Sequence, residues 1–102
     1  MPAGYAIVWR YQVAPQHRDA FERAYSPGGD WARLFATAEG FVRIELMAAR
    51  PGGYVTIDYW RSEADFDHFQ AESGEAYREL DARCESWTVA EERIGGFELI
   101  TG

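Results

Sequence analysis

The clearest feature of the sequence is a change of hydrophobic period in the middle of the chain. From Tyr54 to Trp60, β-branched and aromatic residues alternate with polar ones, which predicts a β-strand. After Ser62, which is placed to cap a helix, acids occupy the first turn and Phe66 and Phe69 stand three residues apart. The pattern therefore predicts a strand that leads directly into a helix. Aromatic rings on both sides of this corner could frame a ligand pocket or simply fill the core.

The remaining strands follow from the same alternation. Residues 5–13 and 41–49 alternate strongly, and residues 87–100 form an extended segment. A bulge is expected in that last segment at Gly95 and Gly96. The Arg-Pro-Gly-Gly sequence at 50–53 predicts a short turn between antiparallel neighbours.

Apolar residues recur at helical spacing in the two long connections, between the first and second strands and between the third and fourth. Pro15 suits the first turn of a helix, which the Ser-Pro-Gly-Gly sequence at 26–29 ends. Asp30 is expected to cap a second helical piece, and Gly40 to stop it. In the second gap, Ser73 is expected to cap a continuation of the helix that starts at Ser62.

The resulting order is βαββαβ, in a chain of 102 residues that predicts a single domain over residues 1–102. This order is typical of a ferredoxin-like α+β fold, in which a four-stranded antiparallel sheet carries its helices on one face. The other face of the sheet would then be uncovered.

Alternation also predicts which strand faces lie under the helices. The odd positions of the first and third strands and the even positions of the second are mostly apolar. The opposite faces mix rings with both signs of charge, including Arg10, Arg43, Glu45 and Asp58. We expect these four residues at the interface of a homodimer closed sheet to sheet. Asp58 could instead be a buried base, although an ion pair is preferred, and a monomer with a wet sheet face is the alternative.

Composition narrows the class of partner. The net charge is −7, with no Lys among the ten basic residues, so neither nucleic acid nor an anionic membrane is an expected partner. No apolar run approaches about 18 residues, so no membrane span is expected. Cys84 is the single cysteine, which excludes an intrachain disulfide and fits a reducing cytoplasm, the expected location.

Titratable groups that could carry chemistry are few. His68 is adjacent to Phe69 and therefore points about 100° round the helix from it, either to solvent or to the mouth of a pocket. His68 with Glu72, or Asp65 with His68, matches helical ligand spacing for a metal. Each pair is incomplete as a ligand set, so no metal site is predicted.

Several stretches resemble the antibiotic biosynthesis monooxygenase family, and together they span most of the chain. They are the Tyr59-Trp60-Arg61-Ser62 corner with Phe66 and Phe69, the Trp9-Arg10-Tyr11 strand, the Trp31 to Phe35 helix and the segment from Gly40 to Leu46. The resemblance implies a dimeric α+β barrel. It also implies chemistry known in some members, which oxidise phenolic polyketides to quinones with O2 and without metal or flavin.

The haem-degrading branch of that family places an Asn on the first strand and a Trp and a His on the second helix. In this sequence those positions read Trp9, Phe69 and either Glu79 or Tyr77. We therefore expect no haem and no other cofactor.

Two functional hypotheses follow. The first is a cofactor-independent monooxygenase acting on a small aromatic or phenolic substrate, with His68 as proton shuttle. Its pocket would lie between helices and sheet, lined by Trp9, Tyr11, Trp31, Phe35, Tyr59, Phe69 and Tyr77. The second is a non-catalytic dimeric protein that binds a small apolar ligand or supports a pathway partner. An open cavity of about 300 Å³ or more favours the first, and a closed interior filled with rings favours the second.

Overall fold

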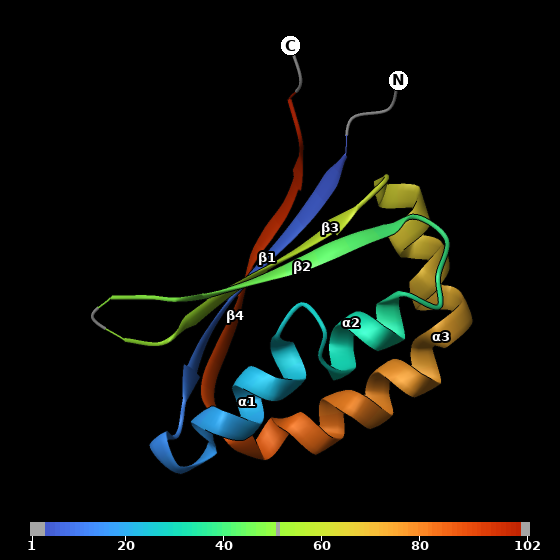
Figure 1. Cartoon of the computed structure of the whole chain (residues 1–102). Helices are drawn as coiled ribbons and strands as arrows, with labels where there is room; N and C mark the ends of the chain where they lie inside the picture. Colours follow the sequence, from blue (N-terminus) through green and yellow to red (C-terminus); the bar gives the residue numbers. More distant parts are fainter. Residues whose placement is uncertain (1–3, 51, 101–102) are drawn as a thin grey trace.

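The computed structural model describes residues 4–50 and 52–100, and it has a four-stranded antiparallel sheet with the helices on one face (Figure 1). The strands lie in the order β2-β3-β1-β4. Their bounds are Tyr5–Val13 for β1, Phe41–Ala48 for β2, Tyr54–Trp60 for β3 and Thr88–Glu98 for β4. The predicted ferredoxin-like α+β fold is confirmed. Pro51, in the predicted turn between β2 and β3, lies outside the described residues.

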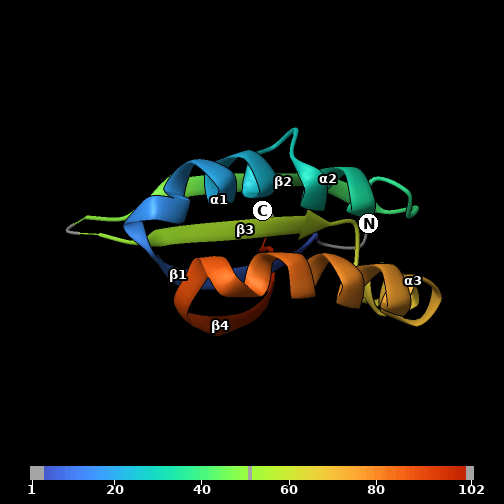
Figure 2. The same ribbon diagram turned by 90° about the horizontal axis from the view of Figure 1, so that it is seen from below.

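Three α-helices and two short 3-10 turns cover the sheet. They are a 3-10 turn at Pro15–His17, α1 (Arg18–Tyr25), α2 (Asp30–Phe35), α3 (Glu63–Cys84) and a 3-10 turn at Glu85–Trp87. Seen from below, α1 and α2 lie along one side and α3 along the other, with β3 between them (Figure 2). No helix within residues 4–50 and 52–100 is both long and apolar enough to cross a membrane.

The helix boundaries follow the predicted signals in most places. Ser62 caps α3, since its Oγ accepts a hydrogen bond from the backbone N–H of Asp65 at 3.1 Å. The prediction that Gly40 ends the second helical piece is wrong, because α2 ends at Phe35 and Gly40 lies directly before β2, with a φ of +96° that glycine tolerates best. At Ser73, where a cap of a continuing helix is predicted, the backbone kinks with φ −121° and ψ 21°, and α3 continues beyond it as one helix to Cys84.

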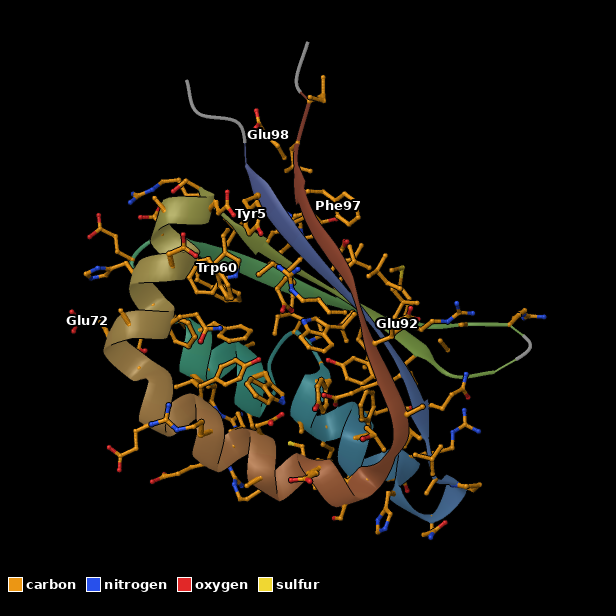
Figure 3. The ribbon with its side chains drawn as sticks, turned by 180° about the vertical axis from the view of Figure 1, so that it is seen from behind. Tyr5, Trp60, Glu72, Glu92, Phe97 and Glu98 are labelled. Carbon is orange, nitrogen blue, oxygen red and sulfur yellow. The ribbon has the colours of Figure 1, made fainter. Side chains whose placement is uncertain are left out.

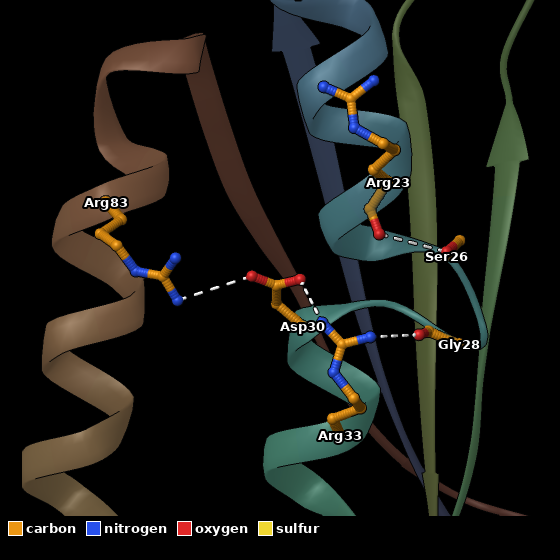
Figure 4. Close-up of polar contacts among 6 residues, drawn as sticks. All are labelled: Arg23, Ser26, Gly28, Asp30, Arg33 and Arg83. Atoms are coloured by element: carbon orange, nitrogen blue, oxygen red, sulfur yellow. Dashed lines mark hydrogen bonds and ion pairs between the residues drawn. The ribbon is translucent and has the colours of Figure 1, made fainter.

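The prediction that Asp30 caps α2 is wrong, because Gly29 occupies the cap position and Asp30 is already helical. The Asp30 carboxylate forms ion pairs with Arg33 at 2.8 Å and with Arg83 of α3 at 3.5 Å (Figure 4). Arg33 also donates a hydrogen bond to the carbonyl oxygen of Gly28 at 2.9 Å. Asp30 therefore links α2 to α3, although its ion pairs are largely exposed and each contributes little to stability.

The predicted faces of β1 and of the centre of β2 are correct, but that of β3 is wrong. Tyr54, Thr56 and Trp60 are buried under the helices, whereas the odd residues of β3 point the other way. The register is the reason. Directly paired residues share a face, and Tyr5 of β1 pairs with Trp60 while Ile7 pairs with Asp58.

Trp60, the last residue of β3, is the centre of the core where β3 leads into α3. It is 1% exposed, and its ring centroid lies 5.3 to 5.5 Å from four phenylalanine rings: Phe35, Phe41, Phe66 and Phe69. Figure 3 shows Trp60 pointing toward the helices, while Phe97 and Glu92 of β4 point away from them. The two faces of the sheet therefore have different environments.

The predicted irregularity in β4 is confirmed. The register of β4 on β1 shifts between Gly95, paired with Val8, and Arg93, paired with Trp9. Gly96 lies against the ring of Tyr5, and a Cβ at this position would collide with the Tyr5 hydroxyl. After the shift, Glu91 and Arg93 lie opposite Tyr11 and Trp9, on the helix side of the sheet.

Candidate functional site

A cavity lies between the helices and the sheet, and aromatic rings form most of its wall. Six rings line it: Trp9, Tyr11, Tyr25, Trp31, Phe35 and Tyr77. They come from β1 and from all three helices, so the complete fold is needed to bring them together. Three carboxyl groups also line the cavity: Asp58, Asp81 and Glu91. An apolar wall with a few convergent polar groups is typical of a small-molecule site.

Five of the seven predicted binding residues therefore meet at this cavity: Trp9, Tyr11, Trp31, Phe35 and Tyr77. Phe69 does not line it; its ring packs edge-on against Phe35 at a centroid distance of 5.2 Å and is 1% exposed. Tyr25 is a lining residue that the sequence did not single out. Its helical spacing from Phe21 marks it as a core residue, and nothing local distinguishes a core ring from a cavity ring.

Tyr59, also predicted to line the pocket, lies on the opposite face of the sheet, because β3 turns its even residues toward the helices. Its hydroxyl donates a hydrogen bond to Glu45 at 2.9 Å. The guanidinium of Arg43 lies 4.2 Å from the centre of its ring. Tyr59 therefore belongs with the charged residues of the outer face.

Asp58, like Tyr59, lies on the face of the sheet opposite to the one predicted. It was expected at a dimer interface, but it pairs with Ile7 and Ile44, both buried beneath the helices, and it lines the cavity. Among the described residues, no hydrogen bond or ion pair to its carboxyl group is present. Loss of hydration by burial raises the pKa of Asp58 to about 7. This position fits the alternative that Asp58 is a buried base and not part of an interface ion pair.

The phenol groups that share the cavity with Asp58 hold their protons firmly. Burial, with a smaller contribution from Asp58, raises the pKa of Tyr11 far above its ordinary value. Burial and the nearby Asp81 and Asp58 raise the pKa of Tyr77 to about 12. The indole N–H of Trp31, a residue 5% exposed, has no hydrogen-bond partner among the described residues. Of these groups, Asp58 is the one that exchanges a proton near neutral pH.

His68 lies away from the cavity. Its side chain is 74% exposed on α3, and its Nε2 lies 3.9 Å from Glu72. Phe69, the next residue, faces the core, so the 100° separation on the helix places His68 in solvent. Within the described part of the chain, no group of three or more His, Cys, Asp or Glu side chains is arranged to hold a metal ion.

The cavity is small, with a volume of about 30 Å³. Space of this size holds one or two water molecules, whereas sites for drug-sized ligands measure about 300 to 1,000 Å³. This volume is far below about 300 Å³, so the space between helices and sheet is nearly closed and filled with rings. Trp9 and Tyr77 are the half-buried rings of the wall, so their movement would enlarge the space at the least cost in buried surface.

The other three predicted interface residues lie on the outer face of the sheet. Arg43 and Glu45 form an ion pair at 3.8 Å, with both side chains about half exposed. Arg10 is exposed and pairs with Glu92 of β4 on one side and Val55 of β3 on the other. Large apolar side chains lie on the same face, including Met47, which is 43% exposed, and Phe97, which is 47% exposed.

The family model for antibiotic biosynthesis monooxygenases matches residues 4–82 of the chain. The chain belongs to this family. The matched segment contains β1 to β3 and most of α3, and so it includes the strand and helix that hold Asp58 and Tyr77. No curated protein matches the chain significantly.

Solved structures with the same fold include relatives with a described activity. Two structures of SnoaB, a cofactor-independent oxygenase from Streptomyces nogalater, each cover 98% of this chain and 96% of their own. A mutant form has 22% identity and a TM-score of 0.72, and the other has 26% identity and a TM-score of 0.66. A Pseudomonas aeruginosa protein has 17% identity and a TM-score of 0.69, with 99% of this chain and 98% of its own covered.

The raised pKa of Asp58 predicts a specific pH dependence of stability. Between pH 4 and pH 7 the folded state retains a proton that the unfolded chain has released, so stability at this site falls as the pH rises. Asp58→Asn removes this effect. The free energy that the variant gains over the parent should be larger at pH 8 than at pH 5 by up to about 2.5 kcal/mol. Urea denaturation of both proteins at the two pH values measures it, and an equal gain at both would show an ordinary carboxyl group.

Proposed function

We propose that this chain is a cofactor-independent oxygenase that oxidises a small phenolic compound held in the cavity between helices and sheet. Membership of the antibiotic biosynthesis monooxygenase family and the likeness to SnoaB support the reaction class. The observation that carries the proposal is the position of Asp58, whose carboxyl group lies in a wall of aromatic rings and has no partner in the part of the chain that the structure describes. Perturbed acids in apolar cavities are frequent at catalytic sites.

In this proposal Asp58 is the general base. It accepts the phenolic proton of the substrate, and a group with a pKa of about 7 is well matched to that task at neutral pH. The phenolate is electron-rich and passes an electron to O2 within the water-poor cavity. Overall, one phenol and one O2 give one quinone and one water, so one oxygen atom enters the ring and no external reductant is needed. His68 has no assigned step, because it is exposed and does not line the cavity.

Substrate binding requires the cavity to open. Tyr77 follows the kink at Ser73, so it lies on a half of α3 that is joined to the first half by one non-helical residue. Trp9 of β1 lines the same cavity, and both rings are half-buried. We propose that outward movement of these two rings admits the substrate. The buried rings of Trp31 and Phe35 then form the fixed part of the wall.

We also propose that two copies associate through the outer face of the sheet. This face combines exposed Met47 and Phe97 with the Arg43–Glu45 ion pair, and burial against a second copy would remove its apolar area from water. The proposed location is the cytoplasm, where Cys84, a buried free thiol, would stay reduced.

The small volume of the cavity supports a second candidate, the non-catalytic dimeric protein in the form that supports a pathway partner and binds no ligand in the cavity. In that case the rings are a packed core and Asp58 has no reacting partner. The two candidates differ in one measurable way. A packed core takes up no ligand, whereas a cavity that opens gives a ligand-induced rise in melting temperature with phenols.

Oxygen uptake with a panel of hydroquinones and anthrones tests the proposed reaction. Asp58→Asn should lower kcat by about 100-fold or more, because a general base contributes about 10² to 10⁴ to the rate. The parent enzyme should gain activity with rising pH through about 7, as Asp58 loses its proton. His68→Gln is the control and should retain the parental rate. No uptake across the panel, or loss of activity in the His68 variant alone, would contradict the proposal.

Size-exclusion chromatography with light scattering tests the assembly. Ile57 lies on the outer face between Val8 and Glu45, so Ile57→Asp should place an unpaired charge in the interface and give monomers at micromolar concentration. Ala71→Asp, on the exposed surface of α3, makes the same kind of change outside the interface and should remain dimeric. A parent protein that is already monomeric would remove the dimer from the account.

A further inference from the structure

We propose that the cavity selects phenols without an acidic substituent, so that a neutral or positively charged phenol binds and the same phenol bearing a carboxylate is rejected. This inference rests on the proposed function in placing the substrate in this cavity. It concerns binding, and it would hold whatever reaction follows.

The charges of the cavity wall carry the argument. Asp58, Asp81 and Glu91 line it, and neither an arginine nor a histidine is among its lining residues in the described part of the chain. Asp58 comes from the centre of the sheet, whereas Asp81 of α3 and Glu91 of β4 are exposed. The wall therefore has one carboxyl group inside and two at its solvent side.

The surface groove next to the cavity is also negatively charged. An open groove of about 510 Å³ lies between the end of α3 and the start of β4, and it shares Asp81 and Glu91 with the cavity. Glu85 is a third acid of this groove. Loss of hydration, followed by repulsion from the carboxylates of Asp81 and Glu85, raises the pKa of Glu91. An anionic ligand would meet this repulsion before it reached the rings.

The two basic residues nearby do not line the cavity, although the charge of Arg93 reaches Tyr77 in its wall. Arg93 is on the helix side of β4, but its guanidinium donates a hydrogen bond to the Tyr5 hydroxyl at 3.5 Å. Arg83 of α3 pairs with Asp30 of α2 at 3.5 Å. Neither lines the cavity, so a ligand carboxylate would lose its hydration without gaining a counter-ion.

A cationic substituent meets the opposite environment. Aromatic faces attract an ammonium group, and carboxylates stabilise it further. The groups that face Asp58 and its neighbours from all sides are Tyr11, Tyr77, Asp81, Glu91 and, farther along β4, Arg93. Two of these groups are acids, one is a cation and two are neutral phenols at pH 7, so the sum of charges around a bound ring is negative.

Three phenols of similar size and different charge test the proposal: para-propylphenol, tyramine and para-hydroxyphenylpropionate. Titration calorimetry of the parent protein at pH 7.5 and low salt, roughly 20 mM, gives their Kd values. The carboxylate should bind about tenfold more weakly than propylphenol or worse, and tyramine at least as tightly as propylphenol. The gap should narrow in about 0.5 M salt, because the two acids at the solvent side are screened there.

A matched pair of variants locates the effect. Glu91→Gln should reduce the gap between propylphenol and the carboxylate, since it removes one charge from the wall. Glu75→Gln makes the same change on the exposed surface of α3 and should leave the gap as it is. The comparison of the three phenols on the parent protein does not depend on how either variant folds.

Equal binding of the three phenols, or tighter binding of the carboxylate, would overturn the inference while leaving oxygenation of a phenol intact. Selective binding without any oxygen uptake would overturn the proposed reaction and support the inference. Failure of all three phenols to bind would overturn the inference, because the cavity would then be a closed core.

Discussion

The pairing of β3 with β1 is the constraint on which the rest of the structure depends. Residues directly opposite each other in an antiparallel pair share a face, and Tyr5, Ile7 and Trp9 of β1 lie opposite Trp60, Asp58 and Thr56. A slip of one residue would turn every side chain of β3 to the other face. Trp60 would then leave the core, and Asp58 would leave the cavity for the outer face.

This register gives the two ends of the helix side of the sheet different properties. Around Trp60 the rings pack at short distances, and the residue is almost inaccessible to solvent. Around Asp58 the packing is incomplete, and half-buried Trp9 and Tyr77 line the same cavity as a carboxyl group that has no partner within residues 4–50 and 52–100. An unpaired buried carboxyl group lowers stability, and natural proteins tolerate such costs mainly at functional sites.

The sequence predicted the topology because most signals were local and unambiguous. The alternation in residues 5–13 and the Ser62 cap each have a single reading, and both are confirmed. The face of β3 was not decided by its pattern, because large apolar residues occupy both sides of that strand. Trp60 favours one face, and Val55 with Ile57 favours the other. Only the partner strand resolves this conflict, and pairing is not visible in a local pattern.

The same ambiguity explains the errors at the site. Asp58 and Tyr59 each lie on the face opposite to the one expected, because they are neighbours on the misassigned strand. Asp81 and Glu91 were not predicted, since they reach the cavity from the last turns of α3 and from the edge strand, and each alone resembles an ordinary surface acid. The neighbours of Asp30 in sequence predict a helix cap, but its partner Arg83 is distant in the chain.

A direct measurement of the protonation of Asp58 tests the central claim that β3 buries this carboxyl group among rings. Titration of the Asp58 side-chain carboxyl carbon by nuclear magnetic resonance, assigned with the Asp58→Asn variant, gives its pKa in the intact protein. The account predicts a pKa of about 7. A value near 3.9, the ordinary pKa of an exposed aspartate at about 25 °C, would contradict it.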